Sequence, residues 1–454
     1  MPVPPPPTHR CVPARRLTRG ARWLASDPDA QSARAATRRA VPRHAVVAPV
    51  ALALLAACGG PHQHPAAAPP LPARRAPAPS AEAHAAPIAA VERGILRRSA
   101  AGVDSGPPTT LAARMAELRV PGVQIAVFDS GRVVWARGYG VRDAATGAPV
   151  DTLTLFQAAS ISKPVAAAGM FRLAERGLVR PDADVNTMLR SWQVPASPFT
   201  ATEKVTLRRI VSHTAGLTVS GFVGYAPGAP LPSLVDILEG RPPANTPPVR
   251  VDRVPGREEQ YSGGGVTVMQ LLMEDVTGAP FTALMDTLVL RPAGMPHSTF
   301  AQPLPDGLAA RAAAGHDTTG RPLPGRYVVL PERAAAGLWA TAPDLARFML
   351  AVGRAYRGEP GGLLEPATAR AMLSPAPGAG AGAYGFGTSG AGPTLRYRHS
   401  GGNPGFRAFA VAFAGAGRGA VVLTNGARGS QLYPELLDAV AREHGWPRMT
   451  MGAP

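Results

Sequence analysis

The sequence predicts an α+β fold with one antiparallel β-sheet built from both ends of the folded chain, flanking helices and an all-helical region. Apolar β-runs with turn signals occur at 123–138 and again at 406–424, whereas helical spacing of apolar residues dominates between them. A two-stranded hairpin is marginally stable by itself. The two hairpins are therefore expected to share one sheet, with the helical middle packed beside it.

The elements are expected in a definite order along the chain. A helix at 111–118 precedes strands at 123–128 and 133–138, which flank the turn signal Asp-Ser-Gly at 129–131. A helix beginning at Ser160 should stop at Gly177 and Pro181. Further helices are expected at 266–276, at 281–290 and from near 343, then strands at 406–413 and 420–424 and a closing helix at 432–444. The Gly- and Pro-rich segment 376–392 is expected to be a surface loop.

The first 104 residues differ in composition from the rest. Residues 1–57 are expected to be an N-terminal extension with an export signal at about 41–57, because a positive flank and a short apolar run precede small residues. The run Leu55-Ala56-Ala57-Cys58 resembles the lipobox of bacterial lipoproteins, which implies lipidation of Cys58. The alternative is a buried apolar segment. A Pro/Ala-rich tether is expected at 58–104, a folded domain at 105–447 and a tail at 448–454.

This resemblance implies a membrane-anchored lipoprotein of the bacterial cell envelope, periplasmic or associated with the outer membrane. The net charge of +17 does not indicate nucleic-acid binding, because ten of the net positive charges lie in the first 100 residues and the other arginines are scattered. Cys11 and Cys58 are the only cysteines, which argues against a disulfide or a thiolate zinc cluster. We expect no metal and no cofactor, and nothing in the sequence indicates a protein partner.

Only two of the 47 basic residues are lysines, Lys163 and Lys204. Lys163 stands three residues after Ser160, and positions i and i+3 of a helix share one face, so the amine can reach the hydroxyl. An amine can shed a proton and accept one from serine, which a guanidinium cannot do. The spacing favours an activated serine. The alternative is a capping serine with a surface lysine, and Lys204 is expected to be solvated.

Four segments in order carry a family resemblance. They are Ser160-x-x-Lys163, Val-Ser-His-Thr-Ala-Gly-Leu at 211–217, Tyr-Ser-Gly at 261–263 and His-Ser-Gly at 399–401. Residues from about 107 to 446 resemble the serine β-lactamase and penicillin-binding-protein superfamily, in particular its class C β-lactamase-like branch of D-aminopeptidases, DD-carboxypeptidases and esterases. The resemblance implies a β-lactamase/transpeptidase-like fold. It also implies a serine hydrolase that forms an acyl-enzyme with a small-molecule or peptide substrate.

The resemblance assigns catalytic roles to four residues. Ser160 would attack the substrate carbonyl, Lys163 could accept its proton and Tyr261 would relay that proton to the leaving group. Whether Lys163 or Tyr261 is the acylation base stays open. His399 would polarise this network or meet a substrate carboxylate, with a satisfied core histidine as its alternative. His213, in the second segment, is expected to hold its loop rather than take part in chemistry.

Other positions would contact the substrate. The backbone N–H groups of Ser160 and Gly402 would form an oxyanion hole, with Ser400, Gly401 and Gly263 as substrate-binding positions. Gly263 departs from the family, which most often has Asn there to hold an amide carbonyl. This departure puts β-lactam and peptide amides, including D-amino-acid peptides, in doubt and gives weight to esters.

Two other classes of protein are alternatives to this family. An α/β-hydrolase would need a Gly-x-Ser-x-Gly turn, and no serine of this chain has glycines at both flanking positions. A non-catalytic penicillin- or peptidoglycan-binding envelope lipoprotein is the remaining alternative. The presence of Ser160, Lys163 and Tyr261 together argues against it.

Overall fold

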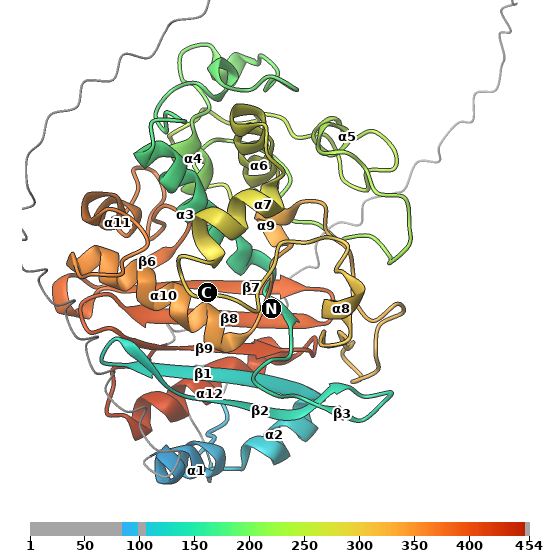
Figure 1. The fold of residues 1–454 in the computed structure, drawn as a ribbon, viewed down its shortest axis with the longest axis vertical. Coiled ribbons are helices and arrows are strands. Elements are labelled where there is room, and N and C mark those ends of the chain that lie inside the picture. Colours follow the sequence, from blue (N-terminus) through green and yellow to red (C-terminus); the bar gives the residue numbers. More distant parts are fainter. Residues whose placement is uncertain (1–83, 99–105, 450–454) are drawn as a thin grey trace, which may run out of the picture. The chain divides into compact units, whose positions relative to one another are not determined.

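A computed structural model describes residues 84–98 and 106–449 (Figure 1). Its main sheet has the order β3-β2-β1-β9-β8-β7-β6, and all neighbouring strands are antiparallel. The strands are β1 Gly122–Asp129, β2 Arg132–Asp143, β3 Ala148–Pro149, β6 Gly387–Ser389, β7 Arg396–Asn403, β8 Phe406–Phe413 and β9 Arg418–Thr424. A separate pair joins β4 Phe156–Gln157 to β5 Trp339–Ala340. The pairing of β1 with β9 confirms a sheet shared by both chain ends.

Helices cover both faces of this sheet (Figure 1). On one face lie α1 Ala85–Arg93, α2 Leu111–Leu118 and α12 Gly429–Glu443, and α10 Ala342–Arg357 packs on the other. The helical region consists of α3 Ser162–Glu175, α4 Leu207–Val211, α5 Leu234–Glu239, α6 Gly263–Thr277, α7 Phe281–Met285, α9 Arg333–Ala336 and α11 Pro366–Met372. The short helix α8 Asp306–Ala309 lies between α7 and α9 in the chain. The predicted helix at 281–290 is α7 followed by one π-helical turn at Asp286–Leu290.

The central strands are apolar on both faces because both faces are covered. Successive side chains of a strand point to opposite sides, so Ile125 and Val127 pack with α2 and α12 while Ala126 and Phe128 face the helical region. All four are fully buried. Such strands read as continuous apolar runs, which is why β1 and β8 could be located from sequence.

The packed domain extends beyond the predicted limits of 105–447. Helix α1, within the predicted tether, buries Ile88 and Val91 in the cluster around α12, and Ile95 after it is also buried. The Ala-rich composition suits a helix, and the spacing of these apolar residues gives it one buried side. Met449, in the predicted tail, is fully buried. Cys58, the signal and the rest of the tether lie outside the described residues.

No helix within 84–98 or 106–449 combines the length and apolar character needed to cross a bilayer.

Candidate active site

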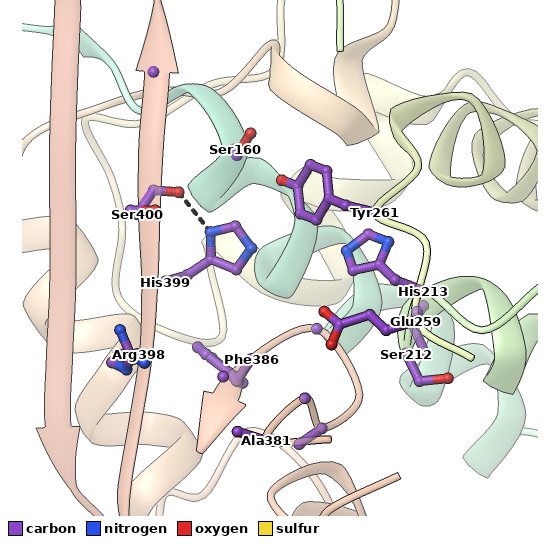
Figure 2. A pocket seen from close by; sticks show the side chains of 16 residues that line it. Ser160, Ser212, His213, Glu259, Tyr261, Ala381, Phe386, Arg398, His399 and Ser400 are labelled. Carbon is purple, nitrogen blue, oxygen red and sulfur yellow. Dashed lines mark hydrogen bonds between the residues drawn. The ribbon is translucent and has the colours of Figure 1, made fainter. Parts of the chain in front are cut away.

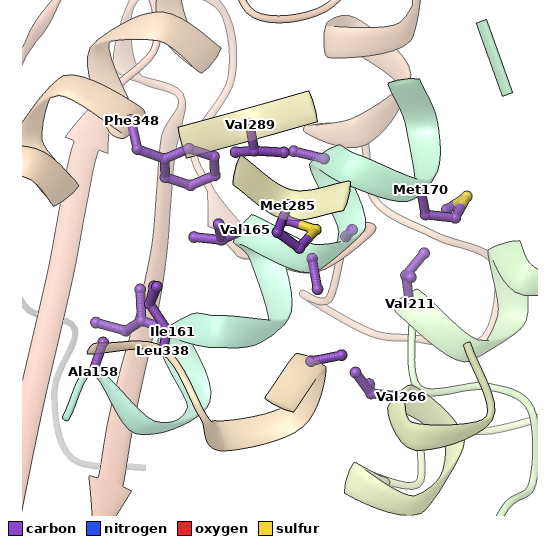
Figure 3. Close-up of a cluster of buried hydrophobic side chains, with 14 of the residues drawn as sticks. Ala158, Ile161, Val165, Met170, Val211, Val266, Met285, Val289, Leu338 and Phe348 are labelled. Carbon is purple, nitrogen blue, oxygen red and sulfur yellow. The ribbon is translucent and has the colours of Figure 1, made fainter. Parts of the chain in front are cut away.

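A cavity of about 470 Å³ opens beside β7, between the start of α3, the segment before α6 and the loop 381–387 (Figure 2). Ser160, Tyr261 and His399 line it, so three predicted catalytic residues from distant parts of the chain meet there. Their convergence depends on the segment Ala159–Ile161 packing on β7 and β8. The main apolar cluster includes Ile161 and Val165 of the nucleophile segment (Figure 3).

Ser160 lies in a strained turn. It occupies the single 3₁₀ turn Ala159–Ile161, which leads directly into α3, so the helix begins two residues later than predicted. Ala159 has a φ of 51°, a left-handed conformation that costs a residue with a Cβ about 1–3 kcal/mol. The surroundings hold the turn: the Ser162 hydroxyl donates to the Ala159 carbonyl at 2.6 Å and accepts the Leu338 N–H at 2.9 Å. The Ser160 side chain is thereby presented to the cavity.

Lys163 is buried beside Ser160, as the spacing predicts. Its Nζ lies 3.1 Å from the Ser160 Oγ and donates to the Ala335 carbonyl of α9 at 2.8 Å. The same Nζ is 4.8 Å from the centre of the Tyr261 ring. Lys204, in contrast, is exposed and donates to the Thr200 carbonyl at 2.7 Å. The two lysines therefore occupy the environments expected of them.

Tyr261 precedes Ser262, the N-cap of α6, and its hydroxyl points toward Ser160 and His399 (Figure 2). The His213 ring lies against it with centres 4.2 Å apart. The Nδ1 of His213 accepts the Ser262 N–H at 3.2 Å, which places the ring proton on Nε2. Burial, together with the charge of Lys163, holds the pKa of His213 well below its usual range. His213 therefore supports Tyr261 through both the ring and the backbone.

His399 lies on the side of β7 that faces the helical region. Its Nδ1 is 2.6 Å from the Ser400 carbonyl, which can only accept, so Nδ1 carries the proton and Nε2 has a free lone pair. Burial is the main cause that lowers the pKa of His399 to about 4, and the Lys163 charge adds to it. The imidazole is thus neutral at pH 7 and is a hydrogen-bond acceptor in the cavity, 6.5 Å from the Tyr261 ring between centres.

A buried polar network that was not expected from sequence joins β7 to the nucleophile segment. Asn403 at the end of β7 donates to Gln157 Oε1 at 2.9 Å and to the Ala336 carbonyl at 3.2 Å. Gln157 in turn donates to the Val328 carbonyl at 2.6 Å. Both amides are buried, so losing either partner would leave unpaired polar atoms. The network fixes His399 relative to Ser160.

The residues of the Ser-Gly-Gly segment after His399 have two roles: some line the cavity, and one packs against the nucleophile segment. Ser400 and Gly402 line the cavity as predicted. Because side chains alternate along β7, the Ser400 side chain lies on the opposite face of the sheet from His399, and so would a side chain at position 402. Gly401 is not part of the wall. A Cβ there would lie 2.2 Å from the Ala158 carbonyl. Gly401 is therefore needed for the close approach of two backbones, and its contact with substrate stays a prediction.

The predicted substrate contact of Gly263 is corrected. Gly263 is buried at the first position of α6, outside the cavity wall, and donates its N–H to the Ser220 carbonyl at 3.2 Å. A Cβ there would meet the Phe222 ring at 2.8 Å. Its φ is not positive, so close packing, rather than a special backbone conformation, requires glycine.

Two parts of the wall were missed by sequence reasoning. The segment 376–392 was expected to be a plain surface loop, but it contains β6 and supplies Ala381, Ala383 and Phe386 to the cavity. Glu259, two residues before Tyr261, also lines it. An acidic residue so close to a catalytic candidate was the available signal. No group of three or more potential metal ligands occurs among the residues that the structure describes.

Comparison with known proteins decides the family. Residues 109–444 match the family model described as Beta-lactamase. The chain belongs to the beta-lactamase family. It is 29% identical over 279 residues to Esterase EstB of Burkholderia gladioli, covering 55% of this chain and 69% of that protein. It is 26% identical over 351 residues to Penicillin-binding protein 4 of Amycolatopsis lactamdurans, covering 73% and 88%.

Solved structures agree on the fold. The chain resembles the crystal structure of SurE with a TM-score of 0.60 and 24% identity over 76% of each chain. It also resembles D-alanine carboxypeptidase AmpC from Burkholderia cenocepacia, with a TM-score of 0.57 and 19% identity over 74% of this chain and 96% of that one. The α+β, β-lactamase/transpeptidase-like fold expected from the motifs is thereby confirmed. The family identifies the chain as a serine hydrolase of this class.

Proposed function

We propose that this protein hydrolyses carboxylic esters and activated amides through an acyl-enzyme on Ser160. The observation that carries the proposal is the Lys163 Nζ, which is buried, lies 3.1 Å from the Ser160 Oγ and is oriented by the Ala335 carbonyl. A surface lysine beside a capping serine would not be held in this way. The arrangement supports an activated nucleophile at the floor of a cavity.

Acylation moves one proton. In the proposed step Lys163, in its neutral form, takes the proton of Ser160 while the Oγ bonds to the substrate carbonyl carbon. Tyr261, whose hydroxyl points toward Ser160, delivers a proton to the leaving oxygen or nitrogen as its bond to that carbon breaks. Lys163 then returns its proton to Tyr261. The neutral His399 offers Nε2 as an acceptor that orients the Tyr261 hydroxyl.

Deacylation reverses these roles with water as the nucleophile. Tyr261 and Lys163 accept a proton from water, water oxygen bonds to the acyl carbon, and the Ser160 Oγ leaves with a proton. Throughout, N–H groups of Ser160 and Gly402 at the cavity wall would hold the negative oxygen, each such donor typically contributing about 3–4 kcal/mol to barrier lowering.

The name of one relative and the site itself favour ester substrates. The relative from Burkholderia gladioli is named an esterase. Position 263 is a buried glycine packed on Phe222, so it cannot supply a side-chain amide to a peptide or β-lactam carbonyl. Penicillins and D-amino-acid peptides are therefore proposed as slower substrates than esters.

Active-site labelling tests the mechanism. The purified protein is treated with a fluorophosphonate and with a fluorescent penicillin, and the modified peptide is mapped by mass spectrometry. We expect the fluorophosphonate adduct on Ser160 and none in Ser160→Ala. Labelling of Ser160→Ala at the wild-type rate would show that another residue is the nucleophile, and a non-catalytic binding protein would show no turnover of 4-nitrophenyl esters.

We further propose that the mature protein is an envelope lipoprotein anchored at Cys58. The support is the sequence Leu55-Ala56-Ala57-Cys58 after an apolar run. In a bacterial host, membrane and soluble fractions of the full chain and of Cys58→Ser should differ, with Cys58→Ser released or unprocessed. Recovery of the unchanged protein wholly in the soluble fraction would contradict the proposal.

A further inference from the structure

Glu259 places a carboxylate at the substrate cavity. It belongs to the segment before α6, and its side chain extends into the space between His213 and the loop that carries Ala381 and Phe386 (Figure 2). Its Oε2 lies 4.0 Å from where a Cβ on Gly380 of that loop would be. The carboxylate thus lies between two walls of the cavity, with its side chain exposed to solvent.

The other ionisable groups at the cavity do not neutralise Glu259. His213 and His399 are uncharged at neutral pH for the reasons given above. Lys163 is held by the Ser160 hydroxyl and the Ala335 carbonyl. Arg398 contributes to the wall, but it pairs across the sheet with Val411, so its side chain is on the face covered by α12. Glu259 is the only carboxylate among the residues lining this cavity.

Glu259 also forms no ion pair or hydrogen bond with the residues that the structure describes, and desolvation alone raises its pKa. The adjacent Glu258 behaves differently, because its Oε1 accepts a hydrogen bond from Arg253 at 3.1 Å. The two neighbouring glutamates therefore differ in whether the protein supplies a cationic partner. Both side chains are exposed, but Glu258 is paired with Arg253, whereas Glu259 faces the cavity without a cationic partner among the described residues.

We propose that Glu259 determines specificity by favouring substrates that carry a positive charge several bonds from the reacting carbonyl. This deepens the proposed function and rests on it. A cationic amine or quaternary ammonium group would supply the missing counter-charge while the carbonyl sits at Ser160. Because Glu259 is partly solvated, the expected gain is that of an exposed ion pair, about five-fold in affinity, and it is screened by salt.

Paired esters measure this preference directly. One 4-nitrophenyl ester ends in a trimethylammonium group and the other in a tert-butyl group, which has the same shape without charge. We expect the cationic-to-neutral ratio of kcat/KM to fall about five-fold in Glu259→Gln through KM, and to be unchanged in the matched control Glu258→Gln. Added sodium chloride should lower the ratio in the wild type and leave it constant in Glu259→Gln.

A binding measurement separates this inference from the proposed function. Calorimetry compares the same acyl chains, as unreactive amides, with Ser160→Ala and with the double variant Ser160→Ala/Glu259→Gln. Tighter binding of the cationic amide only when Glu259 is present supports the inference about Glu259, even if no ester is hydrolysed. The absence of ester hydrolysis would refute the hydrolase mechanism but not this inference. Equal ratios with and without Glu259, in turnover or in binding, would overturn the inference.

Discussion

Glu332 should make this protein less stable as pH rises. It is fully buried at the N-cap of α9, and neither of its carboxylate oxygens has a hydrogen-bond partner among the described residues. The charge of Arg333, the next residue, acts on the pKa of Glu332, and the charge of Glu332 acts on the pKa of Tyr225. Neither residue forms an ion pair or hydrogen bond with the Glu332 carboxylate. Burial raises the pKa of Glu332 to about 7. A buried carboxylate without a partner is costly, so the folded protein favours the neutral acid.

The size and sign follow from linkage. In the unfolded chain this carboxyl has its ordinary pKa of 4.5, and burial raises the pKa to about 7 in the folded protein. Protonation is therefore favoured by folding, so the full stabilisation is present below pH 4.5 and is lost as pH rises to about 7. At about 1.36 kcal/mol per pKa unit, the loss is on the order of 3 kcal/mol in the free energy of unfolding.

Urea unfolding at a series of pH values tests this reasoning. The difference in unfolding free energy between Glu332→Gln and the wild type isolates the group, because other titrations cancel. The unfolding free energy of Glu332→Gln minus that of the wild type should rise by about 3 kcal/mol between pH 4.5 and pH 8. This rise does not depend on the value of the difference at pH 4.5. Glu332→Met, which removes both polar atoms, should show the same pH trend. A difference that stays flat over this range would refute the assignment.

Three further substitutions test the site. Lys163→Arg keeps the charge but cannot accept a proton, so kcat for ester hydrolysis should fall about 1,000-fold or more, whereas Lys204→Arg should retain it; equal activities would make Lys163 a structural cation. Gly401→Ala should force β7 from the nucleophile turn, lowering stability by about 1–3 kcal/mol in urea unfolding together with ester turnover, and a fully stable, active variant would contradict the close contact. Gly263→Asn should lower stability and leave the ester-to-amide ratio of kcat/KM unchanged; a shift toward amides would place position 263 in the cavity.

The fold was predictable where its determinants are local. The bounds of α2 and β8 agree with the prediction, because apolar spacing and turn residues mark them without reference to the rest of the chain. Strand β7 could not be delimited in this way. Its sequence is largely polar and rich in glycine, and it is a strand because β8 pairs with it along its whole length. Helix α1 was hidden by the Pro/Ala composition of the segment before it.

The residues of the site were likewise predictable from sequence only where local spacing determines their position. The contact between Ser160 and Lys163 follows from helical spacing, so the sequence was sufficient for it. Tyr261 and His399 were placed by family resemblance, since nothing local relates residues so far apart. Gly263 was misplaced because a motif gives the order of residues, but whether a position faces a cavity or a neighbouring ring depends on packing.

One consequence of the packing links the two histidines to the proposed chemistry. His213 and His399 are on different elements, yet burial and the Lys163 charge act on both, and each is kept neutral. Each then has one ring nitrogen as an acceptor: His213 uses it on the backbone of Ser262, and His399 keeps it free in the cavity. Protonating either would add a positive charge close to Ser160 and Lys163. With both histidines neutral, the cavity keeps one carboxylate, Glu259, apart from Ser160, and a cationic ester with its carbonyl at Ser160 would complement that carboxylate.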